Sequence, residues 1–354
     1  MELKKFLEEY KPQLENNFLS NEERLRLIKI YDSLEDKPET FDDWLLEHTS
    51  PETIDYVIPF VDPTDVFWKK SFFKKLEESE TKSKTPEEID DSKELLKYHL
   101  RGISKYLPWL GIIHIIVAYP SQVPDWLDCT KVHVVYYKEF IPESYLPTFN
   151  KNTIEMFLHR IKGLSENFIY GLDDKIWVVN PLEPKHFFRE KRPVYEVHYD
   201  DDPSYVNAKN QDAYLAVIKL LDREDVWSKK VIPVYRHMFI PLQKSVYKSI
   251  YETYKNTFLY NITPFPEKFN NSIETFKYLF LLKGYCQDLI HNYNHLEMIH
   301  SFNISRRNIL RMAELYKAFT PLPFYFKTIF EYPVVESPFL LENMFLEKSN
   351  LEKQ

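Results

Sequence analysis

The chain has 354 residues, of which 44% are hydrophobic and 28% charged, as expected for a folded protein with one large domain or two smaller ones. A formal net charge of −8 disfavours a broad nucleic-acid-binding surface, and the 5 glycines form neither a G-x-G-x-x-G nor a P-loop pattern. The first twelve residues are amphipathic rather than a signal peptide, and no apolar run is long enough to predict a membrane span.

The first third of the chain predicts helices, one buried strand and a loop. Residues 1–50 predict short helices, and the apolar run "IDYVIPFVD", 54–62, predicts a buried strand that ends on an acid. Residues 77–92 are polar and charged and predict a mobile insertion. A helix is expected next, because apolar side chains recur there on one helical face: Leu95, Leu96, Leu100, Ile103 and Leu107.

Strands and helices then alternate. Residues 112–120, 131–137 and 167–172 predict strands, and residues 153–161 predict a helix before the last of them. This order predicts an α/β fold with a mainly parallel sheet and flanking helices. In such sheets ligands bind beyond the carboxyl ends of the strands.

We divide the chain into three parts on this basis. Residues 1–50 form an N-terminal helical segment, and residues 51–210 form the α/β core, which contains the insertion at 77–92. Residues 211–354 predict a mainly helical C-terminal part.

Two adjacent carboxylates, Asp173 and Asp174, stand between two strand-like segments in "FIYGLDDKIW". Such a pair suits either a solvated turn or a site for Mg²⁺ or Mn²⁺, whose hard charge prefers carboxylate oxygens. Lys175 either neutralises the pair or reaches a phosphate. Asp62 and Asp65, in "DPTD", also follow a predicted strand. They suit a turn, or contacts to a ribose or metal in the same crevice.

Several cationic or titratable side chains are candidates for phosphate binding or proton transfer. His159 and Arg160 end a predicted helix, where they complement the helix dipole or clamp a phosphate, and Arg101 could serve likewise. His237 precedes "MFIPLQKS", which predicts a helix start. This histidine is either structural or a general base.

Long stretches of the chain resemble the Stealth family. The strongest resemblance is to its second conserved region, in "YLPTFNKNTIEMFLHRIKGLSENFIYGLDD", 145–174, and in the lead-in "HLRGISKYLPWLGIIHIIVAYPSQVPDWL", 99–127. "DYVIPFVDPTDVFW", 55–68, is similar to the first region. "YRHMFIPLQKSVY", 235–247, and "FEYPVVESPF", 330–339, are similar to the third and fourth.

The resemblance implies a transferase. The family includes bacterial capsular-polysaccharide hexose-1-phosphate transferases and the animal GlcNAc-1-phosphotransferase of lysosomal enzymes. They move a sugar 1-phosphate from a nucleotide diphosphate sugar to a hydroxyl of a glycan. The α/β core would then bind the nucleotide sugar, with a UDP-sugar as the first choice, and the C-terminal part would complete the site.

The resemblance also implies residue roles. Asp173, Asp174 and His237 match catalytic positions, and the two aspartates match the positions that bind Mg²⁺ or Mn²⁺. Substrate binding is implied for Asp62, Asp65, Arg101, His159 and Arg160. The implied partners are a nucleotide sugar and a glycan or polysaccharide, without nucleic acid. The implied location is cytoplasmic, either free or peripheral at the inner face of the membrane.

The chain departs from the family pattern at Pro63, Ser92, Phe157, Leu172, Lys175 and Asn270. Asn270 removes an arginine that would contact phosphate, and Ser92 removes an acid. Two alternatives to the transferase therefore stay open. One is a relative that binds glycans or nucleotide sugars without turnover. The other is an ordinary metal-dependent glycosyltransferase, which transfers the sugar without phosphate.

Overall fold

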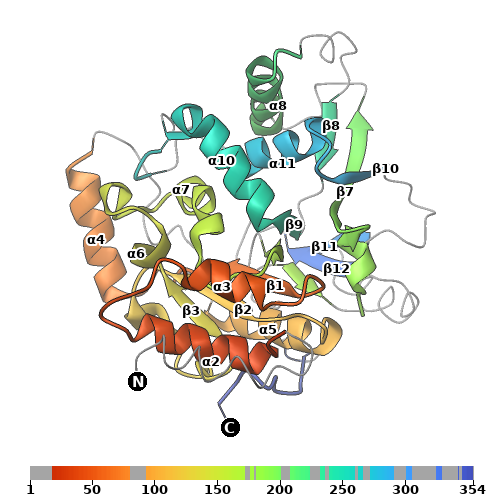
Figure 1. The fold of residues 1–354 in the computed structure, drawn as a ribbon. Helices are drawn as coiled ribbons and strands as arrows, with labels where there is room; N and C mark the ends of the chain where they lie inside the picture. Colours follow the sequence, from red (N-terminus) through yellow and green to blue (C-terminus); the bar gives the residue numbers. More distant parts are fainter. Residues whose placement is uncertain are drawn as a thin grey trace.

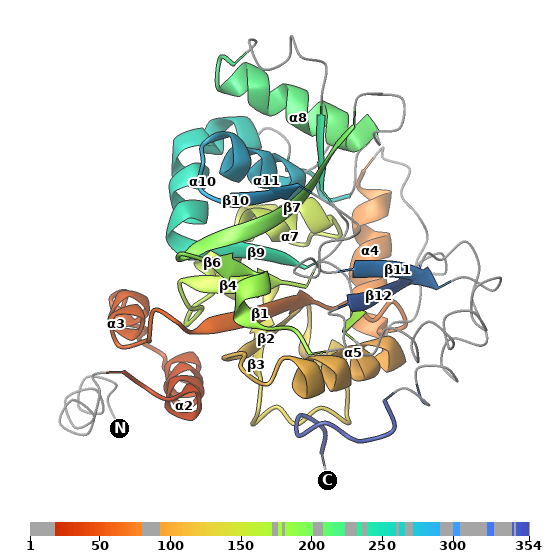
Figure 2. The same cartoon turned by 90° about the vertical axis from the view of Figure 1, so that its right-hand side faces the viewer.

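The computed structural model of the protein describes residues 18–79, 93–171, 176–178, 181–200, 208–223, 232–235, 239–259, 262–265, 272–290, 300–304, 324–328, 342 and 345–353. Within these ranges a central sheet has helices on both faces (Figures 1 and 2). This arrangement confirms the predicted α/β class.

The central sheet has five strands in the order β3-β2-β1-β4-β9. Its first four strands are parallel, and the last is antiparallel to its neighbour β4. Their bounds are β1 Ile54–Pro59, β2 Ile113–Val117, β3 His133–Tyr136, β4 Asn167–Tyr170 and β9 Ile240–Gln243. Each of the four strands predicted from apolar runs is present. Because β1 pairs with both β2 and β4, the ends of these three strands lie side by side.

Both faces of this sheet are buried, which explains why its strands are continuous apolar runs. Val57, Ile116 and Phe168 point into one core, which α7, α10 and α11 cover. Tyr56, Ile115 and Ile169 point into the other, which α5 covers.

The long helices follow the expected patterns. The apolar face predicted for residues 95–107 is the buried face of α5. The helices described are α2 Asn21–Asp32, α3 Phe41–Glu47, α4 Val66–Glu77, α5 Lys93–Tyr106, α6 Tyr137–Phe140, α7 Lys151–Met156, α8 Ala208–Leu220, α10 Lys244–Leu259 and α11 Ser272–Leu282. Among the residues that the structure describes, no helix has the length and apolar character needed to span a bilayer.

Two smaller sheets lie beside the central one. β7 pairs with β6, β8 and β10, and β12 pairs with β5 and β11. Their bounds are β5 Ile176–Val178, β6 Phe188–Arg189, β7 Arg192–Asp200, β8 Ile232–Tyr235, β10 Gln287–Ile290, β11 His300–Ile304 and β12 Phe324–Thr328. The C-terminal part thus contains strands as well as the predicted helices. The insertion predicted for 77–92 lies outside the described residues, except for 77–79.

Two predicted helices differ from the structure. Within the segment "MFIPLQKS", Ile240–Gln243 form strand β9, and α10 begins only at Lys244. Pro241 is tolerated in β9 because this strand is at the edge of the sheet. The helix predicted for 153–161 ends at Met156, and Leu158–Arg160 form a short 3-10 helix, η4.

A buried ion pair joins α2 to the amino end of the sheet. Arg24 donates from its two terminal nitrogens to Asp55, at 3.0 and 2.7 Å. Asp55 also accepts from the backbone of Ile112 and Ser165, both at 2.8 Å, and lies 3.3 Å from His114 Nε2. Burial alone would raise the pKa of the Asp55 carboxyl, but Arg24 and His114 hold it well below its usual range.

Candidate functional site

The loop that follows β1 carries Asp62 and Asp65 at the carboxyl edge of the sheet. Asp62 is buried, and its Oδ1 accepts from the backbone and the hydroxyl of Thr64, at 2.9 and 2.6 Å. Asp65 caps α4 and accepts from the backbone N–H of Trp68 at 2.7 Å. The structure therefore brings these two predicted residues together, and both contribute to the turn.

Gln122 ties this loop to the end of β2. Its side-chain oxygen accepts from the backbone of Ala118 and Tyr119, at 3.0 and 3.3 Å, and its amide donates to the Asp62 carbonyl at 3.2 Å. Because Gln122 is fully buried, these bonds hold the ends of β1 and β2 in fixed register.

A cavity of about 720 Å³ opens at this edge, beyond β2 and β3. A ligand pocket of this size that combines apolar walls with a few polar groups is typical of small-molecule sites. This carboxyl-edge cavity is lined by Ser71, Ala118, Tyr119, Pro120, Tyr136, Tyr137, Lys138, Glu143, Leu146, Pro147, Thr148 and Phe149. Lys138 and Glu143 supply charged groups, and both are exposed.

Tyr137 is a buried side chain with a polar group in the wall of this cavity. Its side chain is nine-tenths buried, and its hydroxyl is among the buried polar atoms for which the structure shows no hydrogen bond. Burial and the nearby Tyr119 raise the pKa of Tyr137 above its usual value, so the hydroxyl stays protonated. A protonated hydroxyl in a cavity wall can donate to an acceptor atom of a ligand.

The end of β4 is packed tightly against β1. Gly171 donates its N–H to the Val57 carbonyl at 2.7 Å. A Cβ atom at Gly171 would overlap the hydroxyl of Tyr56, which is itself fixed by a 2.8 Å bond to His99 Nε2. Only glycine fits here, immediately before the segment that carries the acid pair.

A buried carboxyl group stands beside the end of β4. Glu155 Oε1 accepts from the hydroxyl of Tyr170 at 3.0 Å and lies 3.9 Å from Lys151 Nζ, whereas Oε2 has no hydrogen bond among the described residues. Burial raises the pKa of Glu155 to about 7. At neutral pH this carboxyl can therefore either hold or release a proton.

His159 and Arg160 do not line the carboxyl-edge cavity. The His159 ring packs on Tyr247 and Tyr251 of α10, and α10 begins at Lys244, beside the amino end of β4. Burial, Arg160 and Lys244 lower the pKa of His159 to about 3, so the imidazole is neutral at neutral pH. A neutral imidazole does not supply the positive charge of a phosphate clamp. Arg160 is exposed, with its guanidinium over the Phe157 ring.

Arg101 is engaged with the C-terminal segment. Its guanidinium donates twice to the Glu352 carboxylate, at 2.7 and 2.8 Å, and once to the Phe345 carbonyl at 2.7 Å. This bidentate pair fastens residues 345–353 to α5. The structure thus gives Arg101 a structural partner, and its substrate role stays a prediction.

The three residues predicted to be catalytic, Asp173, Asp174 and His237, lie outside the described residues. So do the departures at Ser92, Leu172, Lys175 and Asn270. Among the residues that are described, no group of three His, Cys, Asp or Glu side chains could hold a metal ion. By donor chemistry the acid pair fits Mg²⁺ or Mn²⁺.

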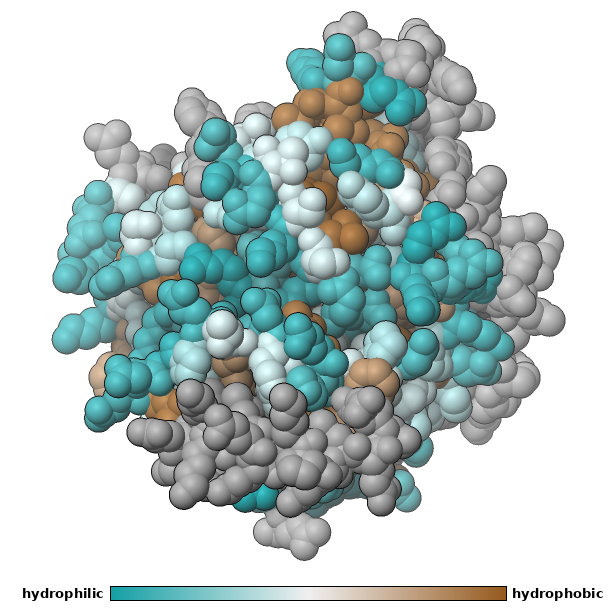
Figure 3. Space-filling view, in the orientation of Figure 1, coloured by the Kyte–Doolittle hydropathy of each residue, from teal (hydrophilic) through white to brown (hydrophobic). Residues whose placement is uncertain are grey.

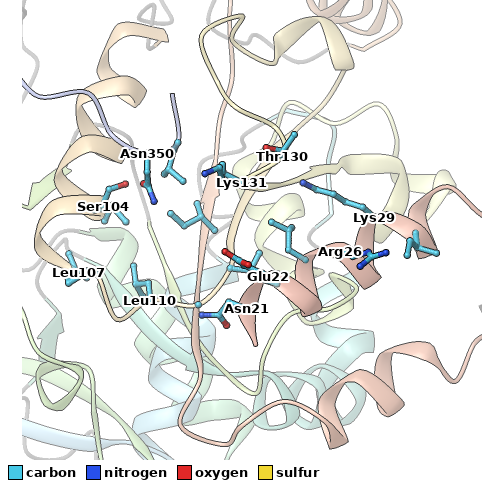
Figure 4. A pocket seen from close by; sticks show the side chains of 18 of the residues that line it. Asn21, Glu22, Arg26, Lys29, Ser104, Leu107, Leu110, Thr130, Lys131 and Asn350 are labelled. Carbon is cyan, nitrogen blue, oxygen red and sulfur yellow. The ribbon is translucent and has the colours of Figure 1, made fainter. Parts of the chain in front are cut away.

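A second cavity, of about 840 Å³, lies at the opposite edge of the sheet. Figure 4 shows Arg26 and Lys29 of α2, Lys131 and Asn350 around it. None of the predicted site residues lines this cavity. Lys29 donates to the carbonyl of Cys129 at 2.7 Å.

Sequence reasoning missed Glu155, Tyr137 and Gln122. Glu155 carried a usable signal, because an acid inside the apolar helical stretch "TIEMFL" falls on a face that should be buried. Tyr137 and Gln122 have no comparable signal, since each is a common residue next to a strand.

Comparison with known proteins finds one matching family model and several relatives. Residues 89–193 match Stealth protein CR2, conserved region 2 of that family. The chain is 32% identical over 216 residues to the capsular polysaccharide phosphotransferase fcs1 of Haemophilus influenzae, an alignment that covers 58% of each chain. It is 32% identical over 212 residues to the capsular polysaccharide phosphotransferase LcbA of Aeromonas hydrophila, which covers 57% of this chain and 58% of the relative.

A longer alignment joins the chain to a capsular polysaccharide phosphotransferase of Neisseria meningitidis serogroup B. The two are 28% identical over 301 residues, 74% of this chain and 79% of the relative. Over the H. influenzae and A. hydrophila relatives the chain spans only 58% of their length. The matched region contains β2, β3, β4 and most of the carboxyl-edge cavity. The chain thus contains a region, residues 89–193, that matches conserved region 2 of the Stealth family.

Proposed function

We propose that the protein transfers a sugar 1-phosphate from a nucleotide diphosphate sugar to a hydroxyl of a glycan, with the nucleoside of the donor in the carboxyl-edge cavity. One observation carries the proposal. Every residue that lines this cavity except Ser71 falls within residues 89–193, which match the Stealth region, and the relatives are named capsular polysaccharide phosphotransferases.

The cavity suits a nucleoside. Tyr119, Tyr136 and Phe149 offer aromatic surface for a base, and the Tyr137 hydroxyl can donate to a base or ribose oxygen. Lys138 provides a cation at the wall for the diphosphate. Gln122 connects Asp62 to this wall, because its side chain is hydrogen-bonded both to the Asp62 carbonyl and to the backbone of Tyr119. Asp62 or its loop would contact the ribose.

In the proposed reaction the acceptor hydroxyl oxygen forms a bond to the β-phosphorus. The bond from that phosphorus to the bridging oxygen breaks, and a nucleoside monophosphate leaves with the electron pair. The acceptor proton passes to a base, for which His237 is the candidate. Catalysis of this kind depends on positioning and on neutralising phosphate charge.

Asp173 and Asp174 would hold Mg²⁺ or Mn²⁺, and that ion, when bound, supplies charge to the phosphate oxygens. Residues at the end of β4 support the segment that carries the acid pair. Tyr170 precedes Gly171, and its hydroxyl is anchored by Glu155. We infer that Glu155 is a positioning residue, which fixes the end of β4 and so the direction in which the acid pair leaves the sheet.

The direct test is product analysis with UDP-GlcNAc and related donors, Mg²⁺ and capsular glycan acceptors. Release of nucleoside monophosphate is the expected result. Release of nucleoside diphosphate would mean an ordinary glycosyltransferase, and donor binding without either product would mean a non-catalytic relative. Either outcome overturns the proposal.

The variants Asp173→Asn and Asp174→Asn test the acid pair. Each should abolish turnover while leaving the circular-dichroism spectrum and the unfolding midpoint unchanged. Asp43→Asn is the matched control, because Asp43 is an exposed aspartate on α3. Unchanged turnover in both active-site variants would rule out the pair as metal ligands.

A further inference from the structure

Helix α4 has an unusual surface. Among the described residues, five large hydrophobic side chains are exposed, and three of them belong to α4: Val66 at 74%, Phe67 at 65% and Phe73 at 40%. The same helix carries four lysines and one glutamate: Lys69, Lys70, Lys74, Lys75 and Glu77. The chain as a whole has a net charge of −8, so this helix is a local cationic exception.

The exposed residues share one side of α4. At 100° per residue, Val66, Lys70 and Phe73 fall within a narrow arc, and Phe67 and Lys74 lie next to it. All five are exposed. In Figures 1 and 3 α4 lies at the left edge of the molecule, where hydrophobic surface shows beside hydrophilic surface.

The opposite side of α4 is firmly packed. Trp68 and Phe72 are buried and contact Phe265 and Phe149, with Phe72 and Phe149 ring centroids 5.0 Å apart. Asp65 caps the helix. Because the inner side is fixed in the core, the outer side presents its apolar and cationic groups in one defined direction.

The residue types on the outer side select the partner. Aromatic and aliphatic side chains flanked by lysines fit the boundary between acyl chains and anionic headgroups of a bilayer. A glycan would need side-chain amides, carboxylates or hydroxyls for its own hydroxyls, and the exposed arc of Val66, Phe67, Lys70, Phe73 and Lys74 offers none of these. We propose that the outer side of α4 docks the protein onto an anionic membrane surface.

Docking through α4 would orient the candidate site. Ser71, at the border between the inner and outer sides of α4, lines the carboxyl-edge cavity, and Phe149 is shared by the cavity and the helix packing. The cavity would then open beside the membrane surface. Docking by α4 does not depend on the proposed transfer reaction, because it needs no turnover.

The test is flotation of the full chain with lipid vesicles. Vesicles of phosphatidylcholine that contain roughly 30–40% phosphatidylglycerol have a strong negative surface potential and should carry the protein. Binding to them should fall as the salt concentration rises. Vesicles of phosphatidylcholine alone should carry much less. Binding is measured without donor or acceptor, so an inactive protein can still pass this test.

Two α4 variants and one control separate the contributions. Lys70→Gln with Lys74→Gln should weaken partitioning about 25-fold, from about fivefold for each lysine. Phe67→Ser with Phe73→Ser should weaken it about tenfold or more on every anionic vesicle. The control, Lys185→Gln with Lys255→Gln, removes the same charge from two exposed lysines outside α4 and should leave only a small change.

Three outcomes would overturn the proposal. They are no flotation with anionic vesicles at low salt, equal loss in the α4 lysine pair and the control pair, and retention on soluble dextran sulfate without vesicle binding. The last result would point to a polyanionic glycan as the partner of α4. All substituted side chains are exposed, so circular dichroism should show folded protein throughout.

Discussion

The two ends of the parallel sheet handle buried charge differently. At the amino end, both oxygens of Asp55 are hydrogen-bonded, to Arg24, Ile112 and Ser165. At the carboxyl end, Glu155 is equally buried but has one oxygen without a hydrogen bond. The first carboxyl has its pKa lowered, and the second has its pKa raised.

The difference separates structural from functional polar groups. A buried carboxylate with a complete set of donors stabilises one conformation, whereas a buried carboxyl oxygen without a donor costs free energy and stays available to a proton or a ligand. On this reasoning the amino end holds the fold together, and the carboxyl end is kept ready for a ligand or a proton. The following variants test that division.

The largest effect is expected for Arg24→Met. The change leaves the buried Asp55 charge without its cation, which costs about 3–5 kcal/mol in the free energy of unfolding. Denaturant unfolding measures the loss. Arg26→Met is the matched control, because Arg26 is exposed on the same helix. A loss no greater than in the control would refute a structural role for the amino-end pair.

The pH dependence of stability should have opposite signs at the two ends. Glu155 has a folded pKa of about 7, above its unfolded value, so its contribution falls as pH rises from about 4.5 to 7. Burial lowers the pKa of His114 to about 4, so its contribution is lost as pH falls from about 6.5 to 4. In the native chain the two partly cancel.

Glu155→Gln should therefore expose the opposite slope, to which His114 and His159, whose pKa values are both lowered by burial, contribute. The free energy of unfolding of the variant should rise more steeply between pH 4.5 and 6.5 than that of the native chain. Over the full titration of Glu155 the difference between the two proteins should change by about 3 kcal/mol. Unfolding at a series of pH values measures it. Identical slopes in the two proteins would show that Glu155 does not titrate in this range.

The sequence predicts the scaffold of the site better than its interior. The strands at 54–62, 112–120, 131–137 and 167–172 are apolar runs, and burial on both faces of a parallel sheet produces that pattern directly. The segment "MFIPLQKS" misleads because its proline resembles a helix start, whereas only the order of strands makes β9 an edge.

Side-chain partners depend on tertiary contacts that no local pattern encodes. Arg101 was expected at a phosphate, and it binds Glu352, 251 residues away in the chain. His159 is predicted to bind substrate, and in the structure its ring packs against aromatic rings from α10. Spacing alone shows neither partner.

A smaller effect is expected for Gly171→Ala, which probes the packing at the carboxyl end. The added methyl group would overlap the Tyr56 hydroxyl, and such overpacking costs about 1–3 kcal/mol. The end of β4 must shift to relieve the overlap. The loss of turnover, expressed as a free energy of activation, should therefore exceed the loss in the free energy of unfolding. Adding Tyr56→Phe should recover part of both losses, and no recovery would place the strain elsewhere.

The smallest effect on stability is expected for Tyr137→Phe. Because the lost hydroxyl has no hydrogen bond in the structure, the free energy of unfolding should change by less than about 1 kcal/mol, or even increase. Tyr247→Phe is the matched control, since it removes a hydroxyl that donates to the Glu155 carbonyl at 2.7 Å and should cost about 1 kcal/mol. If the Tyr137 hydroxyl binds the nucleotide sugar, its loss should weaken nucleotide binding several-fold in calorimetry. A lower free energy of unfolding with unchanged nucleotide binding would instead assign Tyr137 to the core.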